Sequence, residues 1–96
     1  MNILVAYDVN TQSPAGTKRL RKMAKVCEGY GQRVQDSVFE CTIGPADMER
    51  FRVRLLKIID EGEDSLRIYK LLPNREEVVE VYGRDLYRDM NAPLIV

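Results

Sequence analysis

Residues 2–10 read NILVAYDVN, an apolar run that carries one carboxylate, Asp8, close to its end. The run is short and rich in β-branched and aromatic residues, which predicts a β-strand over residues 2–9. Over residues 3–9, both alternating sets of side chains are apolar except for Asp8, so we expect both faces of this strand to be covered. An ionised carboxylate leaves water only when it is paired, hydrogen-bonded or bound to a metal. Asp8 is therefore either a turn-capping residue or part of a metal or catalytic site.

The sequence beyond this strand alternates helical and extended patterns. Ser13 and Pro14 are typical of a helix start, and an apolar stripe with a basic opposite side predicts a helix from about residue 15 to residue 30. The best match is the β-α-β-β-α-β ferredoxin-like arrangement, an α+β fold with a four-stranded antiparallel sheet and two helices on one face. We expect this domain over residues 1–83 and a tail at 84–96. The other predicted elements are a strand at 33–43 (RVQDSVFECTI), a helix at 44–60, and strands at 64–72 and 77–83.

Composition limits the classes of function. The 96 residues predict a single domain, and 15 Lys and Arg balance 15 Asp and Glu, so no net charge attracts a polyanion. The absence of histidine removes the commonest general base and a common zinc ligand. The charge is uneven, however, because residues 1–35 hold six basic residues against two acidic ones. A basic face on the predicted first helix is a candidate polyanion surface, formed by Lys18, Arg21, Lys22 and Lys25.

The cysteines and the hydropathy pattern indicate where the protein works. Cys27 and Cys41 form no CxxC motif, and no apolar stretch is long enough to span a bilayer. We therefore expect a cytoplasmic protein with reduced, structural thiols and no membrane partner.

The first predicted strand is apolar on both faces, which indicates that a second copy of the chain packs against the sheet. Two helices on one face would leave the other face of the sheet bare, and a homodimer packed sheet to sheet would cover it. The apolar end of the tail, with Leu94 and Ile95, is predicted to add an edge strand to the neighbour. Asp8 would then point into the interface beside its symmetry mate. Two nearby carboxylates repel each other unless a cation lies between them, and carboxylates with several waters are the ligands expected for Mg²⁺.

At residues 31–44, GQRVQDSVFECTIG, the chain resembles a known family. This is the small CRISPR-associated endonuclease of the spacer-acquisition complex, the partner of the CRISPR integrase. The resemblance spans about residues 2–83 and includes the motifs VAYDV, KRLRK, RVQDSVFE and DSLRIYKL. It implies a ferredoxin-like homodimer and a metal-dependent nuclease, using Mg²⁺ or Mn²⁺, that acts on single-stranded RNA or double-stranded DNA. It also implies that the dimer bridges two integrase dimers and lies across the DNA to be inserted.

The resemblance also implies roles for single residues. Asp8 matches the metal-binding catalytic aspartate, and Tyr7 matches the aromatic residue before it, a second catalytic candidate. Arg19 matches a helix arginine, while the motif at the second strand contributes an arginine, a serine and a phenylalanine. Together with the basic helix face, the predicted nucleic-acid-binding residues are Arg19, Arg21, Lys22, Arg33 and Ser37. The predicted dimer-interface residues are Phe39, Leu94 and Ile95.

Three functions remain open at this point. The leading hypothesis is a phosphodiesterase in which paired Asp8 residues hold one Mg²⁺ or Mn²⁺ at the dimer axis, with low sequence selectivity because the other contacts are to phosphates. The alternative is a non-catalytic adaptor that bridges integrase dimers and holds duplex DNA. A ferredoxin-like sensor of small ligands ranks last, because the chain has no Gly-rich phosphate loop.

Overall fold

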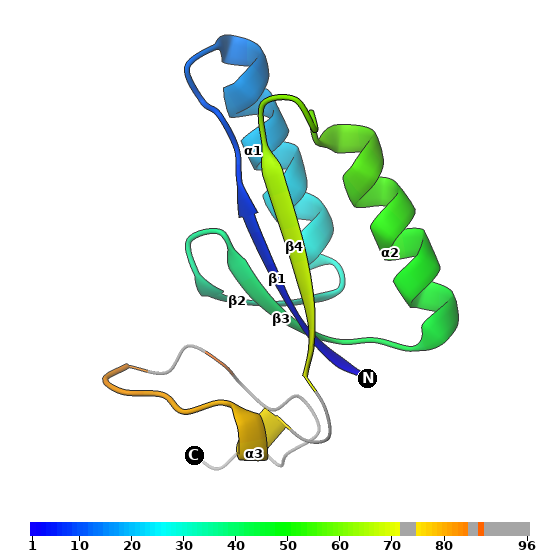
Figure 1. Cartoon of the computed structure of the whole chain (residues 1–96), viewed down its shortest axis with the longest axis vertical. Helices are drawn as coiled ribbons and strands as arrows, with labels where there is room; N and C mark the ends of the chain where they lie inside the picture. Colours follow the sequence, from blue (N-terminus) through cyan, green and yellow to red (C-terminus); the bar gives the residue numbers. More distant parts are fainter. Residues whose placement is uncertain (72–74, 85–86, 88–96) are drawn as a thin grey trace.

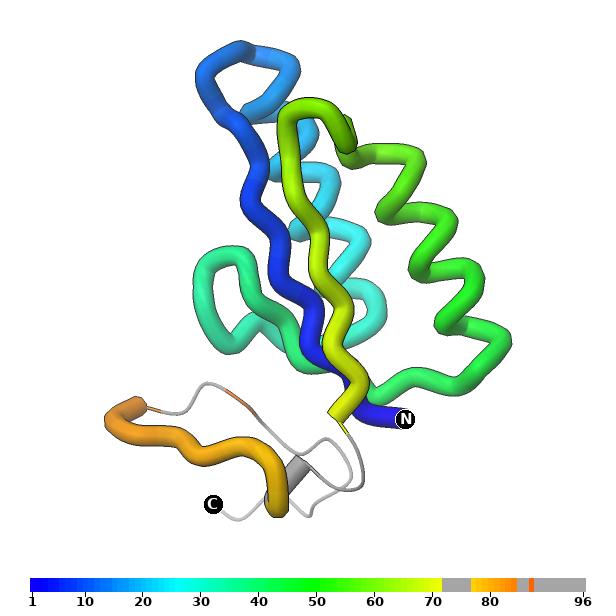
Figure 2. The backbone as a smooth tube through the Cα atoms, viewed as in Figure 1, coloured from blue at the N-terminus to red at the C-terminus, as the bar shows by residue number. Residues whose placement is uncertain are grey.

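The computed structural model describes residues 1–71, 75–84 and 87 (Figure 1). Its strands form one antiparallel sheet in the order β2-β3-β1-β4. Helices α1 and α2 lie side by side on one face of this sheet (Figures 1 and 2), which confirms the predicted α+β ferredoxin-like fold. The elements are β1 (Asn2–Asp8), α1 (Pro14–Glu28), β2 (Gly31–Gln35), β3 (Val38–Thr42), α2 (Pro45–Ile58), β4 (Ser65–Leu71) and the short α3 (Arg75–Val78).

Helix α1 has the start that its sequence predicts. The Ser13 hydroxyl accepts a hydrogen bond of 3.1 Å from the Gly16 amide, and Pro14 takes the first helical position. The oxygen of such a capping residue satisfies a backbone N–H that has no partner within the helix. Met23 and Cys27 are fully buried, whereas the basic residues of the opposite side are exposed. The helix therefore packs on its apolar stripe and presents its cations to solvent.

The core lies between β1 and the two helices. Strand β1 is central in the sheet, between β3 and β4, and Ile3 and Val5 on its helix-facing side are fully buried. Side chains alternate between the two faces of a strand, so Leu4, Ala6 and Asp8 face away from the helices. The remaining fully buried side chains are Met23, Cys27, Phe39, Phe51 and Leu55.

The prediction of a single strand over residues 33–43 is wrong. Asp36 and Ser37 form a two-residue turn, and Gln35 pairs with Val38, so this stretch folds as the β2–β3 hairpin. Asp and Ser are turn-forming residues, but the stretch contains neither Gly nor Pro, the strongest turn signals. The hairpin supplies the strand that completes the four-stranded sheet.

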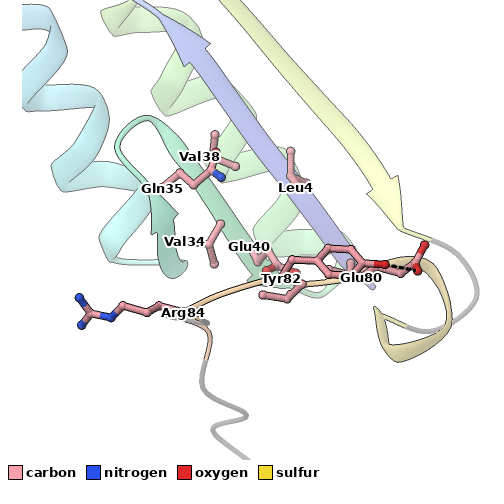
Figure 3. Close-up of a pocket in the computed structure, with 10 residues that line it drawn as sticks. Leu4, Val34, Gln35, Val38, Glu40, Glu80, Tyr82 and Arg84 are labelled. Carbon is pink, nitrogen blue, oxygen red and sulfur yellow. Dashed lines mark hydrogen bonds between the residues drawn. The ribbon is translucent and has the colours of Figure 1, made fainter.

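The strand predicted over residues 77–83 is also wrong. Helix α3 ends at Val78, and residues 79–84 form neither helix nor strand. These residues lie instead against the sheet face that the helices leave open. All of them except Gly83 line a cavity of about 260 Å³, together with sheet residues that include Leu4, Val38 and Glu40 (Figure 3). The chain's own residues therefore approach part of the face for which we expected a second copy.

The predicted tail residues Leu94 and Ile95 lie outside the described residues. None of the helices in the described ranges is long and apolar enough to cross a membrane.

Candidate functional site

The structure places Asp8 at the end of β1, exposed on the sheet face opposite the helices. It stands opposite Ser65, the first residue of β4, in the antiparallel register. The side chain borders an open cavity of about 370 Å³ that we call the Asp8 hollow. Its lining residues are Asp8, Asn10, Gly62, Glu63, Asp64 and Ser65.

A charged hydrogen-bond network holds one wall of the Asp8 hollow. The Asp64 carboxylate accepts bonds of 2.8 Å from Nε and 3.2 Å from Nη2 of Arg19, so the pair is bidentate. It also accepts the backbone amides of Asn10, at 2.9 Å, and Asp60, at 3.0 Å. The side-chain amide of Asn10 donates to Glu63 at 2.8 Å. The network therefore joins α1, the end of β1 and the loop between α2 and β4.

The same network sets the charge of Asp64. The hydrogen bonds from Arg19 lower the pKa of Asp64 from 3.8 to about 2, and the amides of Asp60 and Asn10 add to this effect. The Asp64 side chain is fully buried, and that burial opposes the shift without cancelling it. Asp64 is therefore an anion at neutral pH, with its oxygens engaged by protein donors.

Asp8 is the carboxylate in the hollow that is open to a metal. Within residues 1–71, 75–84 and 87, no hydrogen bond or ion pair engages it, whereas Asp64 and Glu63 already accept protein donors. The same ranges contain no group of three or more His, Cys, Asp or Glu that would hold a metal. Mg²⁺ commonly keeps several waters and uses only one or two carboxylates, so Asp8 fits as one of two such ligands.

Tyr7 lies on the other face of the sheet, in the core. Its ring stacks on that of Phe39 at 6.2 Å, and only 6% of the residue is exposed. Burial raises the pKa of Tyr7 to about 12, and its hydroxyl has no hydrogen-bond partner among the described residues. Tyr7 and Asp8 are neighbours in sequence, but the alternation of the strand separates their side chains. The structure therefore places Tyr7 outside the Asp8 hollow.

The residues predicted from the second-strand motif divide between the core and the surface. Phe39 is completely buried beneath the helices, where it anchors the core of the single chain, and its interface role stays a prediction. The Arg33 guanidinium lies 5.2 Å from the centre of the Phe39 ring, pairs with Glu28 at 3.3 Å and remains 45% exposed. The Ser37 carbonyl accepts the Tyr7 amide at 3.1 Å, so the hairpin turn lies beside the end of β1.

The helix cations also fall into two groups. Arg21 and Lys22 are exposed on α1, as predicted, and remain available for phosphate contact. Arg19, predicted to bind nucleic acid, is only 17% exposed and is engaged with Asp64. In this structure an internal anion therefore holds one edge of the Arg19 guanidinium, and its contact with nucleic acid stays a prediction.

Sequence reasoning missed Asn10, Glu63 and Asp64. The available signal was the acidic sequence DEGED at residues 60–64, which ends at the first residue of the predicted third strand. Its partner Arg19 lies 45 positions away, and no local pattern connects the two.

Comparison with known proteins places the chain in a family. The family model described as CRISPR associated protein Cas2 matches residues 1–78. The chain belongs to the Cas2 family. It is 51% identical, over the full length of both chains, to a protein of Moorella thermoacetica named CRISPR-associated endoribonuclease Cas2 1. It is also 50% identical over 95 residues, 99% of each chain, to the CRISPR-associated endonuclease Cas2 of Halalkalibacterium halodurans.

The solved structures agree with this placement. The crystal structure of Streptococcus pyogenes Cas2 at pH 6.5 superposes with a TM-score of 0.78 and 55% sequence identity, covering 86% of this chain and 100% of the other. At this identity the likeness extends beyond the fold to the family, so the features described above are those of a Cas2 chain.

Proposed function

We propose that the chain is a metal-dependent endonuclease of the CRISPR adaptation machinery, cleaving phosphodiester bonds in single-stranded RNA or double-stranded DNA. The observation that carries this proposal is the Asp8 carboxylate, exposed in the Asp8 hollow and engaged by no donor within the described ranges. The Cas2 relatives named as endoribonuclease and endonuclease support the same reaction class.

The proposed active unit is a homodimer in which two Asp8 side chains face each other across the two-fold axis. Among the described residues, the Asp8 hollow of one chain offers a single open carboxylate, and the second copy supplies the other. A bound Mg²⁺ or Mn²⁺ would supply a Lewis acid that polarises the scissile phosphate and lowers the pKa of a coordinated water. The protein's part is to hold the two carboxylates in place on central strands.

Exposed cations would bind the nucleic acid. Arg21 and Lys22 on α1, and Arg33 on β2, reach solvent and suit phosphate oxygens. Ser37 lies in the hairpin turn beside the end of β1, so a nucleic-acid backbone bound at this turn would also approach Asp8. Contacts of this kind fix the position of a backbone and carry little sequence information.

The test compares Asp8→Asn with the wild-type protein. With Mn²⁺ or Mg²⁺ we expect the wild-type protein to cleave labelled RNA or DNA, and a chelator to abolish this cleavage. The cleavage rate of Asp8→Asn should be lower by on the order of a hundredfold, because the variant lacks a metal ligand. Asp47→Asn is the matched control, since Asp47 is an exposed carboxylate on α2 outside the hollow. Full activity of Asp8→Asn would refute the proposal.

A second function, the non-catalytic adaptor, is favoured by the small number of metal ligands. Among the described residues, the Asp8 hollow offers one open carboxylate, which is a minimal donor set for an efficient nuclease. As an adaptor, the dimer would bridge integrase dimers and hold duplex DNA through its basic faces. This function predicts that Asp8→Asn leaves spacer acquisition intact, whereas the double variant Arg21→Glu/Lys22→Glu abolishes it. The opposite pattern would exclude the adaptor as the sole function.

A further inference from the structure

We propose that Arg19 is a positioning residue for Asp8: through Asp64 it fixes the loop that walls the Asp8 hollow, and it does not contact nucleic acid. The inference rests on the proposed nuclease function for its kinetic consequence. Its structural part, the anchoring of the loop by Arg19, stands on the geometry alone.

The link between Arg19 and the loop is strong and directional. Two nitrogens of the guanidinium donate to the two oxygens of one carboxylate, the arrangement that combines charge with a defined orientation. The Asp64 side chain is fully buried, so water does not compete for these oxygens. Arg19 projects from the first half of α1, which the core packing of Met23 and Cys27 holds in place.

The link from Asp64 to Asp8 runs along both neighbouring strands. Just after β1, the Asp64 carboxylate accepts a hydrogen bond from the amide of Asn10, two residues beyond Asp8. On β4, the residue after Asp64 is Ser65, which stands opposite Asp8 in the register. Asp64 therefore anchors the chain on both sides of the strand end that presents Asp8. The hydrogen bond from the Asn10 side chain to Glu63 adds a second connection between the same two segments.

The surroundings of Arg19 do not suit a phosphate. Asp60 and Glu63 both add negative potential at its guanidinium, beside the directly bonded Asp64. A phosphate that took the edge of the guanidinium formed by Nε and Nη2 would have to displace Asp64 and leave a buried carboxylate without its counter-charge. Arg21 and Lys22, on the same helix, are exposed and meet no such obstacle.

The experiment compares Arg19→Ala, Asp64→Asn and the double variant in the full-length protein, by three measurements. Steady-state cleavage separates kcat from KM. Fluorescence anisotropy in an Asp8→Asn background gives the affinity for labelled RNA and DNA. Amide hydrogen exchange follows Asn10 and Asp60, whose N–H groups donate to Asp64. Arg50→Ala is the matched control, because Arg50 is an ion-paired arginine whose partner, Asp47, does not line the hollow.

We expect kcat to fall about tenfold in each single variant, with KM and affinity within twofold of wild type. The kcat of the double variant should be no lower than that of the single variants, since both residues act as one unit. Amide exchange should accelerate about tenfold at Asn10 and Asp60 in Arg19→Ala, and Arg19→Lys should restore part of kcat. Arg50→Ala should leave all three measurements unchanged, whereas Arg21→Ala should weaken affinity.

Two results would overturn the inference. A loss of affinity in Arg19→Ala that Asp64→Asn does not share would make Arg19 a phosphate contact. Unchanged exchange at Asn10 and Asp60 in Arg19→Ala would show that Arg19 does not hold the loop. If the wild-type protein lacks nuclease activity, the proposed function fails, and the exchange rates still decide whether Arg19 anchors the loop.

Discussion

Replacing Asp64 by asparagine should destabilise the protein in a strongly pH-dependent manner. Folding lowers the pKa of this carboxyl from 3.8 to about 2, mainly through the hydrogen bonds from Arg19. A pKa that is lower in the folded state stabilises that state wherever the group is ionised. Linkage converts this shift into about 2 kcal/mol of unfolding free energy at pH 7. Asparagine keeps the size of the side chain but neither the charge nor the second acceptor oxygen.

The sign of the pH dependence makes this prediction sharp. The contribution of Asp64 is complete above its unfolded pKa of 3.8 and disappears as the pH falls through the folded value of about 2. Urea unfolding followed by circular dichroism, at one protein concentration, should show the full deficit of Asp64→Asn at pH 7 and about half of it at pH 3. Asp47→Asn, an exposed control near the start of α2, should cost less than about 1 kcal/mol at either pH. A deficit of equal size at pH 7 and pH 3 would refute the reasoning, as would no deficit at pH 7.

Two further predictions concern the packing around the site. A Cβ added at Gly16 would lie 1.8 Å from the Asn10 carbonyl oxygen, so Gly16→Ala should lower the unfolding free energy, measured in urea, by about 1–3 kcal/mol. Gly44 has open space around it, so Gly44→Ala should lower the unfolding free energy by less than about 1 kcal/mol. Equal losses in the two variants would contradict this prediction. Burial raises the pKa of Cys27 to about 12 and that of Cys41 to about 11. Iodoacetamide at pH 8 should therefore alkylate the native protein at least about a hundredfold more slowly than the urea-unfolded chain, and rapid native labelling would show that the thiols are accessible.

Local patterns explain most of what was correctly predicted. The bounds of α1 follow from Ser13, Pro14 and the spacing of its apolar residues, and each of these acts within a few positions. The alternation of β1 likewise places Asp8 on the face opposite the helices. The hairpin was missed because Asp36 and Ser37 are a weak turn signal inside an extended, apolar stretch.

The linear order of the residues was enough to identify the fold class, the family and the exposed carboxylate, because periodicity, capping and motif spacing are properties of neighbouring positions. It was not enough to assign Arg19 or Phe39. Whether an arginine meets a phosphate or an internal carboxylate depends on which distant segments are adjacent, and Asp64 lies 45 positions from Arg19. Whether an aromatic ring faces a partner or the core depends on which side of the sheet the helices cover. Both depend on long-range contacts that form only when the chain folds.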